Sequence, residues 1–270
     1  MNYILIRSTI LTLLTVLLGS HAAHTQQSGT FQRPDSIDVA ASSQYRKSNL
    51  VQRLFLGKNY RKTWSTEVRL PVFDLKSSGM EITDLGGGMQ TKSLRLKDRD
   101  GTTWVLRTID KDPVNAVPAK IRNALTVSVV QQIISAAYPY APVTIGALAK
   151  NAHITATDPT IYWVPDDNGF GEYKRFFANK VCLLERKDVT SEKIEVKGTD
   201  KVVINLLTSN VYQVDQRIYL RARLLDMLIG DWDRHAGQWA WESAKQDGQS
   251  LTKPCLKTAI RHSSIPKVYW

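Results

Sequence analysis

The most informative part of this sequence is residues 221–239, RARLLDMLIGDWDRHAGQW. Apolar residues recur here and just upstream at intervals of three or four, which places them on one face of a helix. They are Val214, Ile218, Ala222, Leu225 and Ile229. Gly230 follows, and a glycine directly after the last periodic residue is typical of a helix end. The pattern therefore predicts a buried helix that ends just before Gly230.

A dense group of polar side chains follows the predicted helix. Its members are Asp231, Asp233, Arg234, His235 and Gln238, bracketed by Trp232 and Trp239. Loops held by rigid elements often carry catalytic residues. The structural alternative is that the two carboxylates cap a turn while Arg234 and His235 form surface ion pairs. The apolar helix before this group and the two tryptophans around it favour the interpretation as a catalytic loop over the structural alternative.

The spacing Asp233-Arg234-His235-x-x-Gln238 resembles the Asp-Arg-His-x-x-Asn catalytic loop of phosphoinositide-kinase-like enzymes and the Asn-x-Asp-x-His-x-x-Asn loop of HipA-type kinases. The resemblance implies that Asp233 orients a substrate hydroxyl and that Gln238, in place of Asn, helps to hold Mg²⁺ on nucleotide phosphates. We assign Asp233 and His235 to catalysis, with His235 bracing the loop rather than reacting, and Gln238 and Asp231 to the metal. The run also resembles a domain of large secreted or outer-membrane proteins of Bacteroidetes-type bacteria, where it can stand beside a phosphoesterase domain and a surface-antigen β-barrel.

A second informative block is residues 86–109, GGGMQTKSLRLKDRDGTTWVLRTI. Two β-prone runs flank the turn Asp98-Arg99-Asp100-Gly101, a pattern that predicts a hairpin. Glycines let backbone N–H groups approach an anion because no Cβ intervenes. Lys92 and Arg107 would then neutralise phosphate charge. A plain glycine-rich turn is the alternative.

This block resembles the Gly-rich loop and third strand of a kinase amino lobe, and it precedes the loop candidate in the expected order. The resemblance implies that ATP or another nucleotide is bound by Gly86, Gly87, Gly88, Lys92 and Arg107, with Glu185 in a hinge beside the base. Arg107 replaces the usual strand Lys, so that Lys92 or Lys111 is an alternative. A kinase also carries a Glu on the next helix, and here that helix offers Gln131 and Gln132.

The expected fold class is α+β, a kinase-like two-lobe fold. The strand-rich amino lobe spans residues 65–190, and a helical, truncated carboxyl lobe with the loop candidate spans 191–253. Strands are expected at 66–70, 161–164 and 180–185, and a short helix or turn at 143–149. A helix from 118 to about 137 is expected, with Ile121, Leu125, Val129, Ile133 and Ala136 or Ala137 on its apolar face. Residues 23–45 resemble a flexible leader, and 45–64 a basic, partly helical stretch.

Residues 1–22 are typical of a secretory signal peptide, with Arg7, an apolar run over 10–18 and a small-x-small site at Ser20-His21-Ala22. We therefore expect export, to the periplasm or the outer membrane. The net charge of +11 suits an anionic partner, but the basic residues are scattered and no nucleic-acid signature occurs, so no nucleic-acid partner is expected. Cys182 lies in an apolar run and is expected to be buried, while its pairing with Cys255 is left open.

Residues 254–270 show no clean period and lack the Asp that kinase-like enzymes carry after the catalytic loop. Codons for residues 254–264 can be chosen so that another reading frame spells Val-Pro-Lys-Asp-Arg-Asp-Gln-Ala-Phe-Phe, similar to a segment expected in the Bacteroidetes family. Our hypothesis is a frameshift near codon 254, which would impair activity.

Two other functions remain open. One is a non-catalytic docking module of an outer-membrane or envelope assembly. The other is a metallophosphoesterase-associated domain, because Gly230-Asp231-x-Asp233-Arg234 partly matches the Gly-Asp-x-x-Asp-Arg loop of those enzymes. That match is one residue short. Metallophosphoesterases also use His-rich sets of metal ligands, and this chain has only five His. If the kinase resemblance holds, the acidic loop and the glycine turn are expected to face one cleft and to bind an unidentified hydroxyl acceptor together with the nucleotide.

Overall fold

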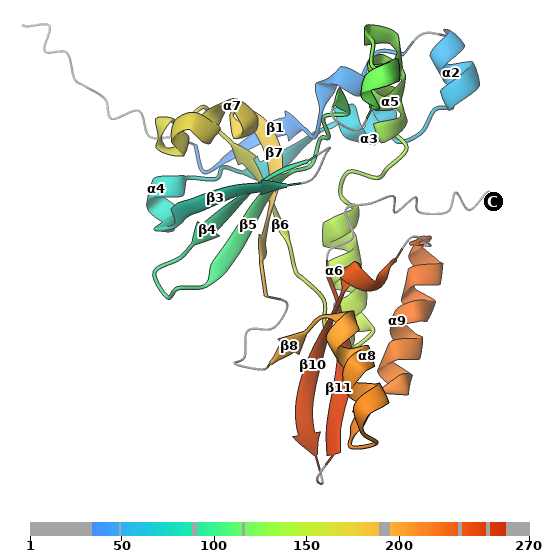
Figure 1. Cartoon of the computed structure of the whole chain (residues 1–270). Coiled ribbons are helices and arrows are strands. Elements are labelled where there is room, and N and C mark those ends of the chain that lie inside the picture. Colours follow the sequence, from blue (N-terminus) through green and yellow to red (C-terminus); the bar gives the residue numbers. More distant parts are fainter. Residues whose placement is uncertain are drawn as a thin grey trace, which may run out of the picture. The chain divides into compact units, whose positions relative to one another are not determined.

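The computed structural model describes residues 34–48, 50–87, 91–114, 117–188, 195–231, 234–246 and 249–257. These residues belong to a unit that begins at Asp35. Helices and strands are mixed along the chain, which confirms the α+β class (Figure 1). Within the described ranges, no helix is long and apolar enough to cross a membrane. The predicted signal peptide lies outside the described residues.

A five-stranded antiparallel sheet is built from strands between residues 81 and 186. Its strands are β3 (Glu81–Gly87), β4 (Lys92–Lys97), β5 (Thr103–Thr108), β6 (Thr160–Val164) and β7 (Lys180–Arg186), in the order β3-β4-β5-β7-β6. The predicted hairpin is confirmed as β4–β5. Its turn is closed by Asp98, whose carboxylate accepts hydrogen bonds from the Thr102 N–H and the Trp104 indole, both at 2.8 Å. The strands predicted at 161–164 and 180–185 are confirmed as β6 and β7.

The two faces of this sheet have separate cores. On one face, Leu94, Leu106 and Cys182 pack against Phe170 and Phe177. The other face is covered by β1 (Ser36–Ala40), β2 (Glu67–Pro71) and α3 (Arg61–Ser65), which pack on Val181 and Leu183. β2 confirms the predicted edge strand. β1 pairs with it along its whole length, so the interpretation of residues 36–40 as part of a flexible leader was wrong.

The helical insertion between β5 and β6 differs from the prediction. A 3₁₀ helix, η3 (Ala119–Ile121), precedes α5 (Ala124–Ile134), which begins where Asn123 and Thr126 form a capping box. The predicted apolar stripe is exposed, at 56% for Ile121, 74% for Leu125, 40% for Val129 and 45% for Ile133. A helical period reveals an apolar stripe but not what covers it. The next helix, α6 (Ala141–Asn151), is longer than the predicted short helix and has Pro142 in its first turn.

A second sheet fills much of the region predicted to be helical, so that prediction was wrong in part. It contains β8 (Val196–Lys197), β9 (Tyr212–Val214), β10 (Trp239–Gln246) and β11 (Gln249–Leu256), in the order β8-β10-β11-β9. The helices of this region are α8 (Thr199–Thr208) and α9 (Gln216–Ile229). α6 and α9 pack with Trp239, Trp241 and Leu256 into one core. Residues 254–256 of the predicted aberrant tail therefore belong to β11, while residues 258–270 lie outside the described residues.

The remaining elements are short. They are the 3₁₀ helices η1 (Ser43–Tyr45), η4 (Asn168–Tyr173) and η5 (Ala236–Gln238), and the helices α2 (Leu50–Leu56), α4 (Leu75–Ser78) and α7 (Lys174–Phe177). Both cysteines are free and buried, as was expected of Cys182.

Candidate functional site

Helix α9 ends where the sequence predicts. Its first turn is capped by Asp215, whose carboxylate accepts a hydrogen bond from the Ile218 N–H at 3.0 Å. Gly230 has a φ of 71°, in the left-handed region that favours glycine. Ala222 and Ile229 on the predicted face are buried. The polar loop therefore starts from a fixed point on a packed helix.

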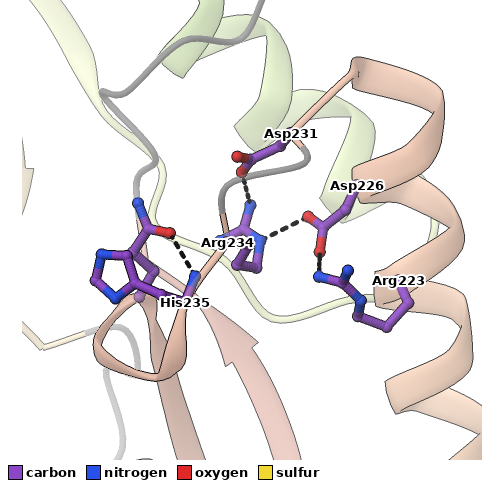
Figure 2. A network of polar contacts seen from close by, with 6 residues as sticks. Arg223, Asp226, Asp231, Arg234 and His235 are labelled. Atoms are coloured by element: carbon purple, nitrogen blue, oxygen red, sulfur yellow. Dashed lines mark hydrogen bonds and ion pairs between the residues drawn. The ribbon is translucent and has the colours of Figure 1, made fainter.

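A buried ion network holds this loop (Figure 2). The Arg234 side chain has 0% exposure; its Nε lies 2.6 Å from Asp226 Oδ1 and its Nη2 lies 2.7 Å from Asp231 Oδ2. The second oxygen of Asp226 accepts from Arg223 Nη1 at 2.7 Å. The guanidinium also lies over the Trp239 ring, 5.4 Å from its centroid. One arginine thus joins the last turn of α9, the start of the loop and the first residue of β10.

The electrostatics of the network follow from its burial. Burial raises the pKa of the Asp226 carboxyl, and the Arg234 and Arg223 guanidinium groups act against that rise. Buried charges are tolerated only when they are paired and hydrogen-bonded, because their hydration is lost. Breaking one contact therefore costs far more than breaking a surface pair.

The predicted catalytic residue Asp233 lies outside the described residues, as does Trp232. Their flanking residues Asp231 and Arg234 are both placed and are joined to each other.

His235 and Gln238 brace the other side of the loop. His235 Nδ1 accepts from the Gly237 N–H at 3.2 Å. Gln238 Oε1 accepts from the His235 N–H at 3.1 Å, the bond drawn at His235 in Figure 2. These bonds form the capping box of η5. His235 therefore has the bracing contact expected of it.

The predicted metal ligands have structural partners. Asp231 is 2% exposed and its carboxylate is paired with Arg234, while the Gln238 oxygen accepts from the backbone. An amide oxygen has two lone pairs, so the bond to His235 leaves one for a cation. In the part of the chain that is described, no group of three or more His, Cys, Asp or Glu side chains is arranged to hold a metal ion.

The backbone conformation at Gly87 explains why a glycine stands at this position. Gly86 and Gly87 end β3 opposite Ser93 and Lys92, and Gly88 lies outside the described residues. Gly87 has a φ of 122°, and a Cβ on it would overlap the Thr91 carbonyl oxygen. Only glycine can occupy such a conformation without strain.

The strand register sorts the predicted phosphate-binding residues onto two faces. Gly86, Ser93 and Arg107 are direct neighbours across β3, β4 and β5, so they share a face. Lys92 is one residue away from Ser93 and therefore points to the opposite face, where its Nζ lies 5.5 Å from the centre of the Phe176 ring. The structure brings Gly86 and Arg107 together, and it separates Lys92 from them.

Glu185 joins the Arg107 face. It is 6% exposed and its Oε1 lies 3.5 Å from Arg107 Nη2. The residue expected beside a nucleotide base is thus the partner of the strand arginine. A buried carboxylate orients the guanidinium that it pairs with.

Sequence reasoning missed Asp226 and Arg223. Asp226 lies next to Leu225 on the buried side of α9 and is 1% exposed. The available signal was an acid four residues after Ala222, on the apolar face itself. An acid at such a position requires a buried partner.

Comparison with known proteins adds no relative: no family model matches the chain, and no curated protein or solved structure does. The function must be argued from the residues themselves.

Proposed function

We propose that the chain is an exported, kinase-like phosphotransferase domain that binds ATP or another nucleotide with Mg²⁺ and transfers phosphate to a hydroxyl. The observation that carries the proposal is the buried Arg234 brace, the pair of contacts by which the Arg234 side chain joins Asp226 of α9 to Asp231. Such a brace has a clear purpose if Asp233 must be positioned to within a fraction of an ångström.

The order of parts supports the same proposal. A glycine turn joins the first two strands of the five-stranded sheet, and a basic residue, Arg107, lies on the third. The helices α5 and α6 follow, and the sheet then closes with β6 and β7, which carries Glu185. This is the sequence of parts that the kinase resemblance implies, and the braced loop comes after it.

The proposal gives each residue one task. Asp233 orients the acceptor hydroxyl, His235 shapes the loop, and Arg107, held by Glu185, neutralises phosphate charge beside Gly86. Asp231 pairs with Arg234 in the brace. Gln238 would contribute one oxygen to Mg²⁺, whose role is to neutralise phosphate charge. The described residues do not form a complete magnesium site.

The test is nucleotide binding, since the frameshift hypothesis predicts weak or absent turnover. We expect ATP to raise the melting temperature only when Mg²⁺ is present, and Arg107→Met to remove that shift. Asp100→Asn, in the exposed hairpin turn, is the matched control for Asp233→Asn in a phosphate-transfer assay of the frame-restored protein. The proposal fails if ATP and GTP give no shift with Mg²⁺ and the frame-restored protein transfers no phosphate.

A second candidate function, an envelope docking module, is supported by exposed apolar side chains on α8 and α9. On α9, exposure is 60% for Leu220, 55% for Leu224, 74% for Met227 and 69% for Leu228, and Leu207 of α8 reaches 83%. Apolar surface of this kind commonly marks an interaction site. An exported location also favours docking, because ATP is scarce outside the cytoplasm. Binding of an envelope fraction that is lost in Leu224→Gln/Leu228→Gln, without any nucleotide effect, would select this candidate.

The third candidate, a metallophosphoesterase-associated domain, has no specific support. Such chemistry requires clustered metal ligands, and none is found among the described residues.

A further inference from the structure

A cavity of about 630 Å³ lies at the end of the five-stranded sheet where β4 and β7 begin. It is bounded by β1, the end of β5, α5 and the Phe176 ring. Its size is within the range of small-molecule sites, roughly 300–1,000 Å³. None of the tasks in the proposed function uses it.

Two lysines reach this cavity without a carboxylate partner. Lys92 begins β4 and Lys180 begins β7. By alternation along their strands, both point to the face that carries Phe176, as does Thr108 between them on β5. Among the described residues, neither ammonium group forms an ion pair, and the Lys92 Nζ instead lies over the Phe176 ring. The buried Thr108 hydroxyl adds a polar group to the same wall.

The carboxylates of the wall are already engaged. Asp38 pairs with Arg69 at 2.9 Å and Glu67 with Arg46 at 3.6 Å. Asp110 accepts from the Tyr45 hydroxyl at 2.9 Å, from the Lys111 N–H at 2.9 Å, and from the Gln44 side-chain amide. The fourth carboxylate, Asp112, accepts from the Val114 N–H at 2.9 Å. The four carboxylates of the wall equal its four basic side chains in number, and of the basic side chains Lys92 and Lys180 form no ion pair among the described residues.

A buried chain of hydrogen bonds, from Gln131 through Tyr45, ends on the Asp110 carboxylate. The Gln131 side-chain amide donates to the Tyr45 hydroxyl at 2.6 Å, and Tyr45 is 0% exposed. Burial, with Asp110 nearby, raises the pKa of Tyr45, so the phenol stays a neutral donor to the carboxylate. A carboxylate whose lone pairs are taken by three donors is a poor cation ligand. This argues against a metal site in the cavity.

We propose that the cavity binds a small polyanion, with acidic oxygens between Lys92 and Lys180 and its remaining part against the Phe176 ring. The two lysines start strands separated by one strand and are offset by two residues along it, so their backbones are roughly 12 Å apart and their long side chains can converge on one ligand. Phosphate and carboxylate oxygens share the required chemistry. Lys92 and Lys180 point to the face opposite to Arg107, and Arg107 does not line the cavity, so the site is independent of the proposed nucleotide contacts.

The experiment is isothermal titration calorimetry of the full chain in EDTA, with pyrophosphate in one arm and succinate in the other. We expect at least one of them to bind, and Lys180→Ala to weaken binding about tenfold because one charge-assisted contact is lost. Lys180→Glu should abolish binding. Lys180 is exposed, so these variants are expected to fold, and circular dichroism checks this. The arm that binds more tightly distinguishes a phosphate from a carboxylate ligand.

Lys150→Ala, an exposed lysine on α6, is the matched control and should leave binding unchanged. The proposal is overturned if neither anion binds at millimolar concentration, or if Lys150→Ala weakens binding as much as Lys180→Ala does. It is also overturned if Arg107→Met abolishes binding while Lys180→Ala does not, because the anion would then occupy the face of the proposed nucleotide site. A failed Mg²⁺–ATP experiment leaves this metal-free result unaffected, so the two proposals fail separately.

Discussion

Replacing Arg234 with methionine tests the brace directly. Methionine fills most of the arginine stem but removes the guanidinium, so Asp226 and Asp231 both lose their contact with it while they remain buried at 1% and 2% exposure. Removing one partner of a buried ion pair costs about 3–5 kcal/mol. That is a large part of a total folding stability of roughly 5–15 kcal/mol.

The expected loss is measurable in two ways. For a unit of this size, each 1 kcal/mol lowers the melting temperature by roughly 2–4 °C, so we expect a fall of about 6–20 °C. Urea unfolding followed by the fluorescence of Trp239 and Trp241 should give the same loss of free energy with an unchanged slope. Asp226→Asn combined with Arg234→Met should cost less than the sum of the two single changes, because they remove one shared contact.

The chain contains a matched control on its surface. Arg69 pairs with Asp38 at 2.9 Å, but the two side chains are 64% and 58% exposed. Solvent screening limits such a pair to about 0–1 kcal/mol, so Arg69→Met should change stability little. Equal losses for Arg234→Met and Arg69→Met would refute the brace. A stable Arg234→Met that keeps full nucleotide response would refute its role in positioning Asp233.

Three further outcomes follow from the described geometry. Gly87→Ala should destabilise the chain by about 1–3 kcal/mol because its φ of 122° disfavours a side chain, and thermal unfolding measures this. Cys182 and Cys255 should resist iodoacetamide at pH 8 in the folded state and react in urea, since burial raises the pKa of both thiols, that of Cys255 to about 12; mass spectrometry reports the labelled fraction. The Trp104 indole and backbone N–H groups lower the pKa of the Asp98 carboxyl in the folded chain. The ionised carboxylate therefore stabilises the fold fully above its unfolded pKa, and this contribution is lost as the pH falls through the folded pKa. Asp98→Asn should reduce the fall in melting temperature on the acid side of a stability-versus-pH curve.

Local patterns predicted the elements whose signal is contained in the chain itself. The α9 period, its glycine end and the Asp98 hairpin turn were correct because they depend on residues a few positions apart. The period located the apolar stripe of α5, but it cannot say whether a stripe is covered, and Leu125 is 74% exposed. β11 was missed because Pro254 lies within it, and proline normally argues against a strand interior.

The arrangement of the predicted phosphate-binding residues was harder to predict, because strand register determines which face of the sheet each side chain occupies. Lys92 and Arg107 were both expected at phosphate, but Arg107 is opposite Ser93, one residue away from Lys92. A displacement of one residue changes the face. No local pattern fixes that displacement. Likewise, the contact of Arg234 with Asp226 joins two elements across a turn, and only the folded chain shows it.

The frameshift hypothesis leads to a last prediction, which the second sheet makes specific. If a single base is restored at codon 254, the other frame places valine at position 255, proline at 256 and lysine at 257. Position 255 is fully buried and 257 is exposed, so an apolar and a charged residue both fit. Proline at 256 would remove the N–H that now donates to the Thr155 carbonyl at 2.8 Å, a loss of about 1 kcal/mol. It would also replace Leu256, which is 1% exposed in the core with Trp239 and Trp241. The restored frame therefore costs the sheet one hydrogen bond and part of a core contact. Sequencing the gene around codon 254 decides the matter, because the hypothesis requires that one added base yields the whole ten-residue peptide without a mismatch.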